Sequence, residues 1–319
     1  MKIASTLFIV LSSFAALSAA ADYPARPVRL VVPYAAGGST DTLARILSAP
    51  FSARLGQQVV IDNRTGAGTL IGTDIVAQAA PDGYTVLMAT PPLAVNPSLY
   101  PKVSYDLERD FAAVTNVAGS SNLLVVHPSV PAHSVKELIA LLRENPGRYN
   151  YGSSGVGGAS HLAMALFTNM AKVDAVHIPY KGGAPAVAEL VAGRLQLMMA
   201  NLTTAQPHIK AGRLRGLGVG TAARTPLFPE LPTIAEAGVP GYEANNWNGV
   251  VVPRGTPAGV IERLHRDIVA VLGDAATSRR LAAQGLEPIG DTPAQFARYL
   301  RNEAGKWGKL IRTAGIKPE

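Results

Sequence analysis

The chain has 319 residues, of which 48% are hydrophobic and 16% are charged, and it contains no cysteine. This length suffices for one large or two medium-sized globular domains, and the lack of cysteine excludes disulfides, thiolate-bound metals and thiol catalysis. The formal net charge is +7, but the basic residues between positions 254 and 317 alternate with acids. That mixture indicates a solvated helical surface and excludes a continuous basic stripe for nucleic acid.

The first 21 residues have the pattern of a secretory signal peptide. A positive start at Lys2 precedes an apolar stretch over residues 3–17, and small residues follow at 18–21. The apolar stretch is short and leads directly into polar sequence, which favours a cleaved signal, near Ala20–Asp22, over an uncleaved anchor. No other stretch reaches the ~18 apolar residues of a transmembrane helix. We therefore predict export to a bacterial periplasm, without a lipid-bearing cysteine at the cleavage site.

The residues that follow alternate between strand and helix patterns. We expect strands at residues 28–32, 59–61 and 85–88, and helices at 42–55 and 70–79. Residues 90–97 contain three prolines, which predicts a loop. The β-α-β-α-β order predicts a mostly parallel sheet with helices on both faces.

A second set of strand and helix patterns begins near residue 123. We expect strands at 123–126, 149–151, 175–178, 195–199 and 214–219, and helices at 135–143, 161–170 and 186–192, with Ser134 as an N-cap. A proline-rich connection covers 224–233, a strand covers 249–252, and the tail is helical over 260–272 and 293–314. Two β/α sets in series indicate a two-lobed α/β protein, in which a ligand sits between the carboxyl ends of the strands of the two lobes.

Three glycine-rich turns follow predicted strands, at residues 34–41, 152–160 and 180–184. Each leads into a helix pattern, so its backbone N–H groups and the helix dipole form a seat for an anion. One dipole contributes at most ~2 kcal/mol, whereas micromolar binding needs about 8 kcal/mol. Several hydrogen bonds to a charged group must therefore converge. Asp41 either caps its helix, orders its turn or meets the ligand, and Lys181 pairs with a ligand carboxylate or with a protein acid.

Nucleotide and metal chemistry find little support in these turns. Residues 155–160 lack the last glycine of G-x-G-x-x-G, no acidic residue follows at the expected distance, and no Walker A motif occurs. The six histidines are scattered without metal-ligand spacing. Residues 152–156 do not match G-x-S-x-G. A less favoured alternative is an exported hydrolase that uses Ser154 and His161.

Taken in order, short motifs along nearly the whole mature chain resemble one family, the Bug-type substrate-binding proteins of tripartite tricarboxylate transporters. The motifs are Tyr23-Pro24, Pro33-Tyr34 with Gly37-Gly38 and Asp41, Asn63-Arg64 with Gly66-Ala67-Gly68, Ala80-Pro81-Asp82-Gly83-Tyr84, Tyr151-Gly152-Ser153 with Gly155, Gly157 and His161-Leu162, His177-Ile178-Pro179-Tyr180-Lys181-Gly182, Leu231-Pro232-Thr233 and Trp247-Asn248-Gly249. Thr65 and Ala113 stand where the family usually has proline, which concerns loop stiffness.

The resemblance implies a periplasmic receptor with a type II periplasmic-binding-protein fold, in which two α/β lobes close about a hinge. Lobe 1 is expected to comprise residues 22–120 and 250–319, and lobe 2 residues 121–249, with crossings near 116–122 and 246–250. The receptor would bind a small carboxylate, such as a di- or tricarboxylate, an acidic amino acid or an aromatic acid. It would deliver this ligand, as a monomer and without cofactor or metal, to a two-subunit membrane permease. A sensor that feeds a membrane signalling protein is the alternative.

The predicted pocket combines the three turns with neighbouring strand ends. In the resembling family the turn matching residues 34–41 holds a carboxylate through backbone groups and bridging waters, and the loop matching 152–161 contributes from the other lobe. The predicted ligand-binding residues are Tyr34, Ala36, Gly38, Thr40, Asp41, Thr90, Ser154, Gly155, Gly157, Ser160, His161, Tyr180, Lys181 and Asn201.

Overall fold

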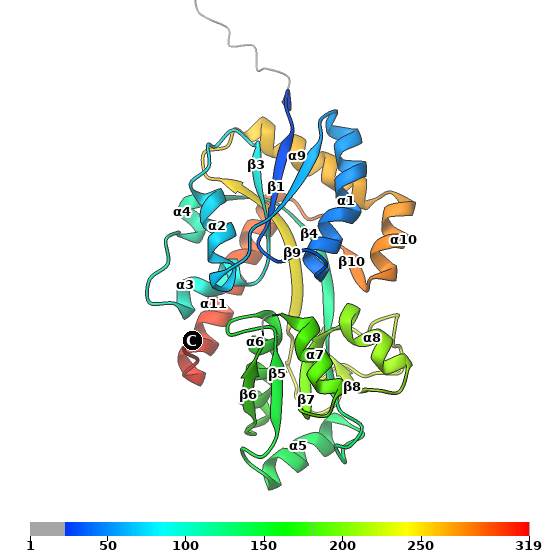
Figure 1. The fold of residues 1–319 in the computed structure, drawn as a ribbon. Helices are drawn as coiled ribbons and strands as arrows, with labels where there is room; N and C mark the ends of the chain where they lie inside the picture. The colour runs from blue at the N-terminus through cyan, green and yellow to red at the C-terminus, as the bar shows by residue number, and fades with distance from the viewer. Residues whose placement is uncertain (1–22, 181, 319) are drawn as a thin grey trace, which may run out of the picture.

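The computed structural model describes residues 23–180 and 182–318 (Figure 1). The predicted signal peptide, residues 1–21, and Lys181 lie outside the described residues. The strands follow the spatial order β2-β1-β3-β9-β4-β7-β5-β6, and β10 and β8 also pair with β4. Helices flank this curled sheet in two lobes, lobe 1 around β1–β3 and lobe 2 around β5–β7 (Figure 1).

Lobe 1 is built on three parallel strands, as the β-α-β-α-β order predicts. β1 (Val28–Val32) lies between β2 (Val59–Asn63) and β3 (Thr85–Ala89), and β3 pairs antiparallel with β9 (Asn245–Pro253). β1 is apolar apart from Arg29 and almost fully buried, as a central parallel strand should be. The lobe's remaining elements are α1 (Ser39–Leu55), the 3-10 turn Ala67–Thr69, α2 (Leu70–Ala77), α4 (Leu107–Asp110), α9 (Ala258–Leu272), α10 (Ala275–Ala283) and β10 (Leu286–Pro288).

Lobe 2 repeats the pattern with β5 (Asn150–Ser153) between two parallel neighbours. Those neighbours are β6 (Val176–Pro179) and β7 (Leu197–Asn201). Lobe 2 also contains the helices α5 (Val135–Glu144), α6 (Ala159–Ala171), α7 (Gly183–Val191) and α8 (Leu202–Lys210), and the strand β8 (Arg215–Val219). The predicted cap of α5 is present, because Ser134 Oγ accepts from the Glu137 amide at 3.2 Å.

Two long strands run between the lobes. β4 (Phe111–Val126) pairs with β9 as far as Ser121, and from Asn122 onward it pairs with β7 and β8. β4 therefore leaves the lobe 1 strands and joins the lobe 2 strands in a buried polar stretch that includes Ser120, Ser121 and Asn122. The lobe limits at residues 120/121 and 249/250 stay a prediction.

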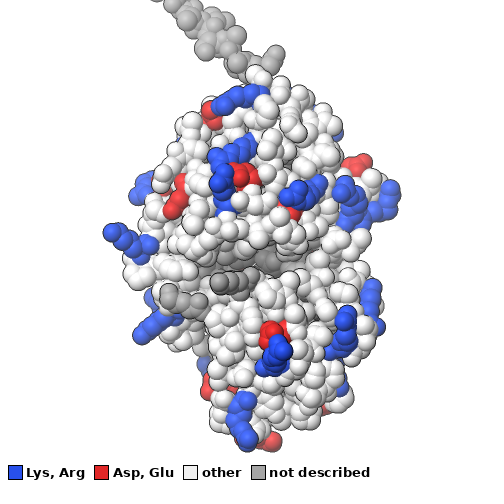
Figure 2. All heavy atoms as spheres, viewed as in Figure 1, with Lys and Arg blue, Asp and Glu red and all other residues white. Residues whose placement is uncertain are grey.

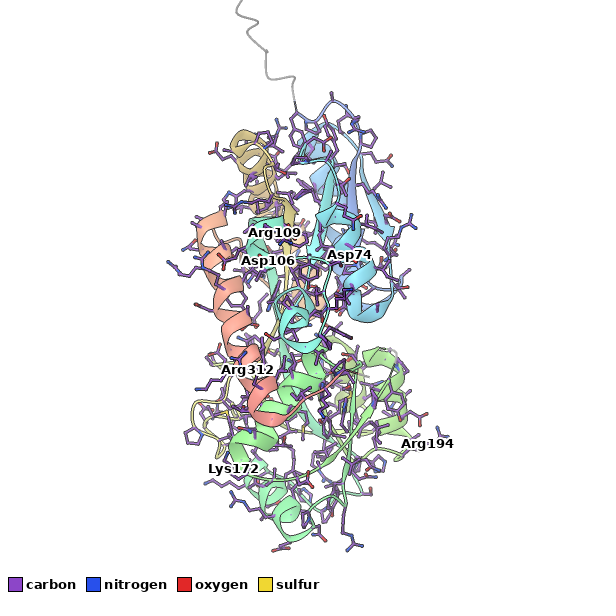
Figure 3. All side chains as sticks on the ribbon, turned by 90° about the vertical axis from the view of Figure 1, so that its left-hand side faces the viewer. Asp74, Asp106, Arg109, Lys172, Arg194 and Arg312 are labelled. Carbon is purple, nitrogen blue, oxygen red and sulfur yellow. The ribbon has the colours of Figure 1, made fainter. Side chains whose placement is uncertain are left out.

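Helix α11 (Pro293–Ala314) crosses both lobes outside the sheet. Figure 3 shows it running down one side of the molecule, with Arg312 near its lower end. Phe296 and Leu300 pack into a lobe 1 cluster, whereas Trp307 and Ile311 pack into the lobe 2 core. One helix thus contributes to two hydrophobic cores, so any movement between the lobes must be accommodated along it. Among the described helices, none has the length and apolar character needed to cross a membrane.

The prediction of a loop over residues 90–97 is wrong, because helix α3 (Pro92–Leu99) forms there. Pro92 occupies the first turn, where an N–H would have no intrahelical partner. Pro97 lies inside the helix and cannot donate to the carbonyl of Leu93. The hydroxyl of Tyr105 donates to that carbonyl instead, at 2.9 Å. A side chain from a later segment therefore compensates for the proline.

Candidate ligand-binding site

The turn after β1 is organised by a buried carboxylate. Asp41 is 1% exposed, and its Oδ2 accepts from the Gly37 amide and from Arg45 Nε, both at 2.8 Å. Its Oδ1 accepts from Asn63 Nδ2 at 3.0 Å, and the same amide group donates to the Tyr34 carbonyl at 2.9 Å. Of the roles considered for Asp41, the structure shows the one that orders the turn, since the N-cap of α1 is Gly38 and receives no side-chain bond.

The protonation of Asp41 follows from these contacts. Burial by itself would raise the pKa of the carboxyl, but the hydrogen bonds from Arg45, Gly37 and Asn63 together lower it below its ordinary value. Asp41 is therefore ionised at neutral pH, with three donors already on its two oxygens. Contact between Asp41 and a ligand stays a prediction.

The other predicted residues of lobe 1 lie around this turn. The Tyr34 and Thr90 hydroxyls are 3.2 Å apart, which links the turn to the end of β3, and burial raises the pKa of Tyr34. Ala36 and Gly38 are exposed at the tip of the turn, and Thr40 is buried in the first turn of α1. The structure therefore brings all six predicted lobe 1 residues together.

The predicted residues of lobe 2 converge on the loop between β5 and α6. Ser160 Oγ accepts from the Ser154 amide at 2.8 Å and lies 2.9 Å from Ser154 Oγ. Gly157 has φ +74°, and a Cβ there would lie 2.3 Å from Leu99 Cδ2 of α3. The positive φ and this close approach both favour glycine at this position, and the loop of lobe 2 packs against α3.

Of the remaining predicted residues, Tyr180 lies beside this loop, whereas the side chain of Asn201 bonds elsewhere. The Tyr180 carbonyl would lie 3.4 Å from a Cβ at Gly155, so it borders the loop. Asn201 instead caps α8 through the Thr203 amide at 3.0 Å, and it donates to Ser120 Oγ of β4 at 2.8 Å. Its side chain is thus held at the crossing between the lobes.

A stacked histidine pair, which the sequence patterns did not reveal, lies behind the lobe 2 loop. The rings of His161 and His177 are 5° from parallel with centroids 3.9 Å apart, and Tyr151 stacks 4.9 Å beyond His177. The pairing of β5 with β6 sets Tyr151 opposite His177. The available signal was therefore the strand register, which single-sequence patterns do not supply.

Both imidazoles are neutral in the fold. Burial and the neighbouring His177 lower the pKa of His161 to about 3, and burial lowers the pKa of His177 to about 4. The imidazole Nδ1 of His161 accepts from the Gly157 amide at 3.1 Å, which requires that nitrogen to be unprotonated.

We expect this pair to make the protein less stable in mild acid. In the unfolded chain both histidines take up protons below pH ~6.5, whereas in the fold they do so only near 3 to 4. Each then lowers the free energy of unfolding by up to ~1.4 kcal/mol per pH unit as the pH falls between these limits. Melting temperatures from pH 7.5 to 4.5 measure the slope. The double variant His161→Asn/His177→Gln should show a shallower decline, and an unchanged slope would contradict the assignment.

At all three predicted anion seats, the helix begins after a glycine N-cap. The N-caps of α1, α6 and α7 are Gly38, Gly158 and Gly182, and none provides a side-chain acceptor. Side chains cap the helices α4, α5, α8, α10 and α11. The helices α2, α3 and α9 also have no side-chain cap, but their N-caps are not glycines. In α1 and α6 the first intrahelical bonds are donated by Thr42 and Leu162. The preceding helical amides have no intrahelical acceptor and can meet an anion.

These helix starts face a hollow between the lobes. α1 begins at the lower end of lobe 1, and α6 and α7 begin at the upper end of lobe 2 (Figure 1). Figure 2 shows that this face of the molecule is hollowed along the same band, and that the charged side chains in view lie above and below it. Among the described residues, the turns that border this band therefore offer a ligand backbone groups and hydroxyls.

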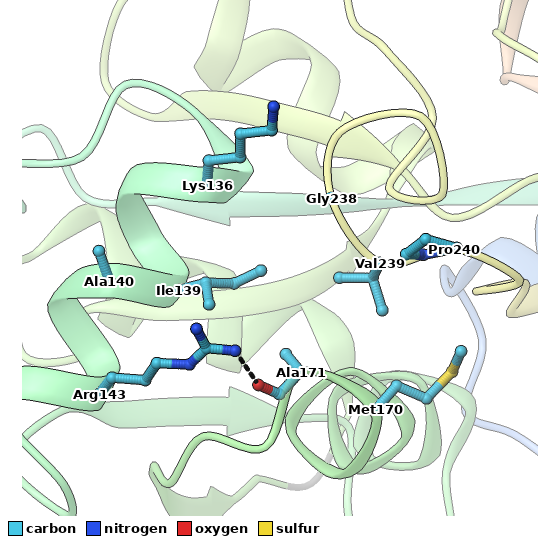
Figure 4. Close-up of a pocket in the computed structure, with 9 residues that line it drawn as sticks. All are labelled: Lys136, Ile139, Ala140, Arg143, Met170, Ala171, Gly238, Val239 and Pro240. Carbon is cyan, nitrogen blue, oxygen red and sulfur yellow. Dashed lines mark hydrogen bonds between the residues drawn. The ribbon is translucent and has the colours of Figure 1, made fainter.

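A separate cavity of about 360 Å³ lies on lobe 2, between α5, the end of α6 and the segment 238–240 (Figure 4). Arg143 crosses one side of it and donates to the Ala171 carbonyl at 3.0 Å. None of the predicted ligand-binding residues lines this cavity. Across the described parts of the chain, no group of three or more acidic or histidine side chains is arranged to hold a metal ion.

Two hinged α/β lobes with helix N-termini turned toward the space between them define a solute-binding protein of the type II periplasmic-binding class. The family model described as "Tripartite tricarboxylate transporter family receptor" matches residues 43–316. The chain belongs to this family, in its Bug branch. It is 37% identical to the protein BugT of Bordetella pertussis, over 98% of this chain and 96% of that protein.

Solved structures agree with this assignment. The Rhodopseudomonas palustris protein Rpa4515 with adipate has a TM-score of 0.86 and 42% identity, over 93% of this chain and 100% of that chain. MatC from the same organism with bound malate has a TM-score of 0.81 and 30% identity, over 91% and 100%. The family is one of receptors, and this chain is a receptor rather than an enzyme. The hydroxyl of Ser153 does lie 2.6 Å from His177 Nε2, but Ser153 is 0% exposed.

Proposed function

We propose that this protein is a periplasmic receptor that closes on a small dicarboxylate and delivers it to a two-subunit membrane permease. The observation that carries the proposal is the adipate complex of Rpa4515, which shares 42% identity with this chain over 93% of this chain and 100% of Rpa4515. The malate complex of MatC supports the same ligand class, since both ligands are dicarboxylates.

The geometry of the two turns supports this ligand class. A dicarboxylate carries an anion at each end, and amides at helix starts are available in both lobes, at α1 and at α6 and α7. The turn held by Asp41 would take one carboxylate, and the loop 152–160 together with Tyr180–Gly182 would take the other. Lys181→Ala would then weaken binding if Lys181 pairs with the ligand, as the sequence predicts.

We expect adipate and malate to raise the melting temperature of the mature protein. A ligand at one hundred times its Kd adds about 2.7 kcal/mol to the free energy of unfolding, which corresponds to a rise of several degrees in a protein of this size. Adipamide, the uncharged diamide of adipate, is the matched control, and citrate, glutamate and benzoate extend the acid series. Calorimetry should give one site per chain. A shift with adipamide or glucose, and none with any acid, would sink the proposal.

Delivery and location need separate tests. We propose that the receptor is a monomer and that it contacts the permease transiently. Ligand uptake by vesicles that contain a candidate two-subunit permease should then depend on added receptor. Export is checked by sequencing the N-terminus of the protein from a periplasmic extract, which should begin near Ala20–Asp22.

A further inference from the structure

The loop 152–160 of lobe 2 is held by hydrogen bonds from its glycine amides to side chains within the lobe. The Gly157 amide donates to His161 Nδ1 at 3.1 Å, and the Gly155 amide donates to Ser153 Oγ at 3.1 Å. Ser153 Oγ is in turn 2.6 Å from His177 Nε2. Each imidazole of the stacked pair is therefore connected to one glycine of the loop, His161 directly and His177 through a hydroxyl.

The remaining bonds of the loop continue this pattern. The Ser154 amide donates to Ser160 Oγ at 2.8 Å, and the Gly158 amide donates to the Gly155 carbonyl at 3.1 Å. The amides of residues 154, 155, 157 and 158 are thus already committed within the protein. The amides of Ala159, Ser160 and His161, which precede the first intrahelical bond of α6, are the ones that the helix start leaves for a ligand.

The loop is also held from the opposite side. A Cβ on Gly157 would lie 2.3 Å from Leu99 Cδ2 and 3.9 Å from Val95 Cγ1, so the backbone at Gly157 touches α3. His161 is 5% exposed, and the His161 ring packs between the loop and the ring of His177. Gly157 therefore sits between α3 and the histidine pair, and a loss of either support would let it move.

The geometry points to His161 and His177 as positioning residues of the ligand site, whose imidazoles hold the loop 152–160 by its Gly157 and Gly155 amides and do not themselves contact the ligand. This inference rests on the proposed function, because it concerns the site at which the carboxylate would bind. It assigns a role to His177 and Ser153, and it changes the role of His161 from ligand contact to loop support.

Matched substitutions separate the two roles of His161. Asparagine carries its side-chain oxygen near the position of Nδ1 and can still accept from Gly157, whereas leucine fills a similar volume without an acceptor. With adipate as the probe in calorimetry, we expect His161→Leu to weaken binding about tenfold. His161→Asn should stay within about threefold of the wild type. His177→Gln, which keeps a polar group near Nε2, should likewise bind more tightly than His177→Leu.

Amide hydrogen exchange of the ligand-free protein gives a readout that does not depend on a ligand. Peptides that cover residues 152–160 should exchange faster in His161→Leu than in His161→Asn, while peptides from lobe 1 should be unchanged. If the wild type binds no carboxylate but the exchange pattern appears, the proposed function fails and the inference about the loop stands.

Two results would overturn the inference. One is a His161→Leu protein that binds adipate and exchanges like the wild type. The other is a His161→Asn protein that binds as weakly as His161→Leu while its loop exchanges normally, since the imidazole would then be a ligand contact. If His161→Leu does not fold, the His177→Gln and His177→Leu pair decides by the same two measurements.

Discussion

Replacement of Asp41 by alanine is expected to destabilise the protein by about 2–4 kcal/mol and to weaken carboxylate binding by at least about tenfold. The substitution removes the acceptor of the Gly37 amide, of Asn63 Nδ2 and of Arg45 Nε in a site that is 1% exposed. Hydrogen bonds to a buried charge contribute about 1.5–3 kcal/mol each, and donors left without a partner add a desolvation cost. The turn would lose the group that fixes the helix-start amides at the proposed carboxylate site.

Asp62 supplies the matched control for this experiment. It lies on the adjacent strand β2 and also pairs with two arginines, Arg29 at 2.5 Å and Arg64 at 2.9 Å. Its side chain is 22% exposed, compared with 2% for Asp41. Exposed ion pairs contribute little, so Asp62→Ala should cost less than about 1 kcal/mol and leave affinity unchanged. Denaturant unfolding and calorimetry measure both quantities. Equal effects of the two substitutions would show that the turn does not depend on Asp41.

Replacement of Glu303 by leucine is expected to cost about 3–5 kcal/mol, the largest loss of stability that we predict for a single side chain. Glu303 Oε2 accepts from the indole nitrogens of Trp247, at 3.1 Å, and of Trp307, at 2.7 Å. Both tryptophans are at most 3% exposed. Leucine would leave two buried N–H groups without an acceptor, at about 1–3 kcal/mol each.

The Glu303 contact also connects the two lobes. Trp247 is on the crossing strand β9 and packs in a lobe 1 cluster, and Trp307 packs in the lobe 2 core. Glu303→Gln keeps one accepting oxygen and should cost no more than about 2 kcal/mol. Because the chain has only these two tryptophans, their fluorescence reports the unfolding of this contact directly, and circular dichroism reports the whole chain. A leucine variant as stable as the glutamine variant would contradict the assignment.

The alternation of strands and helices could be predicted from local patterns, because apolar periodicity and turn residues act over a few neighbours. β1 covers the predicted residues 28–32, and α11 covers the predicted residues 293–314. The glycine-rich turns at 34–41 and 152–160 were recognisable for the same reason. Their glycine N-caps and positive φ values at Gly37, Gly155 and Gly157 are properties that local sequence carries.

Other features depend on partners that are distant in the chain, and the sequence alone did not reveal them. The helix over Pro92–Leu99 persists because Tyr105 satisfies a carbonyl that Pro97 leaves free. β4 extends back to Phe111 through polar residues because β9 pairs with them along the crossing.

The role of each site residue also depends on partners that are distant in the chain. Asp41 could be placed in the turn from sequence, but its role depended on Asn63, which β2 brings alongside β1. His161 could be named as a candidate, but its partner His177 arrives through the register of β5 with β6. By itself the sequence determined where the turns and helix starts lie, since those depend on local backbone preferences. Tertiary structure decided which side chains hold them, because hydrogen bonds between distant segments exist only once the sheet has set its register.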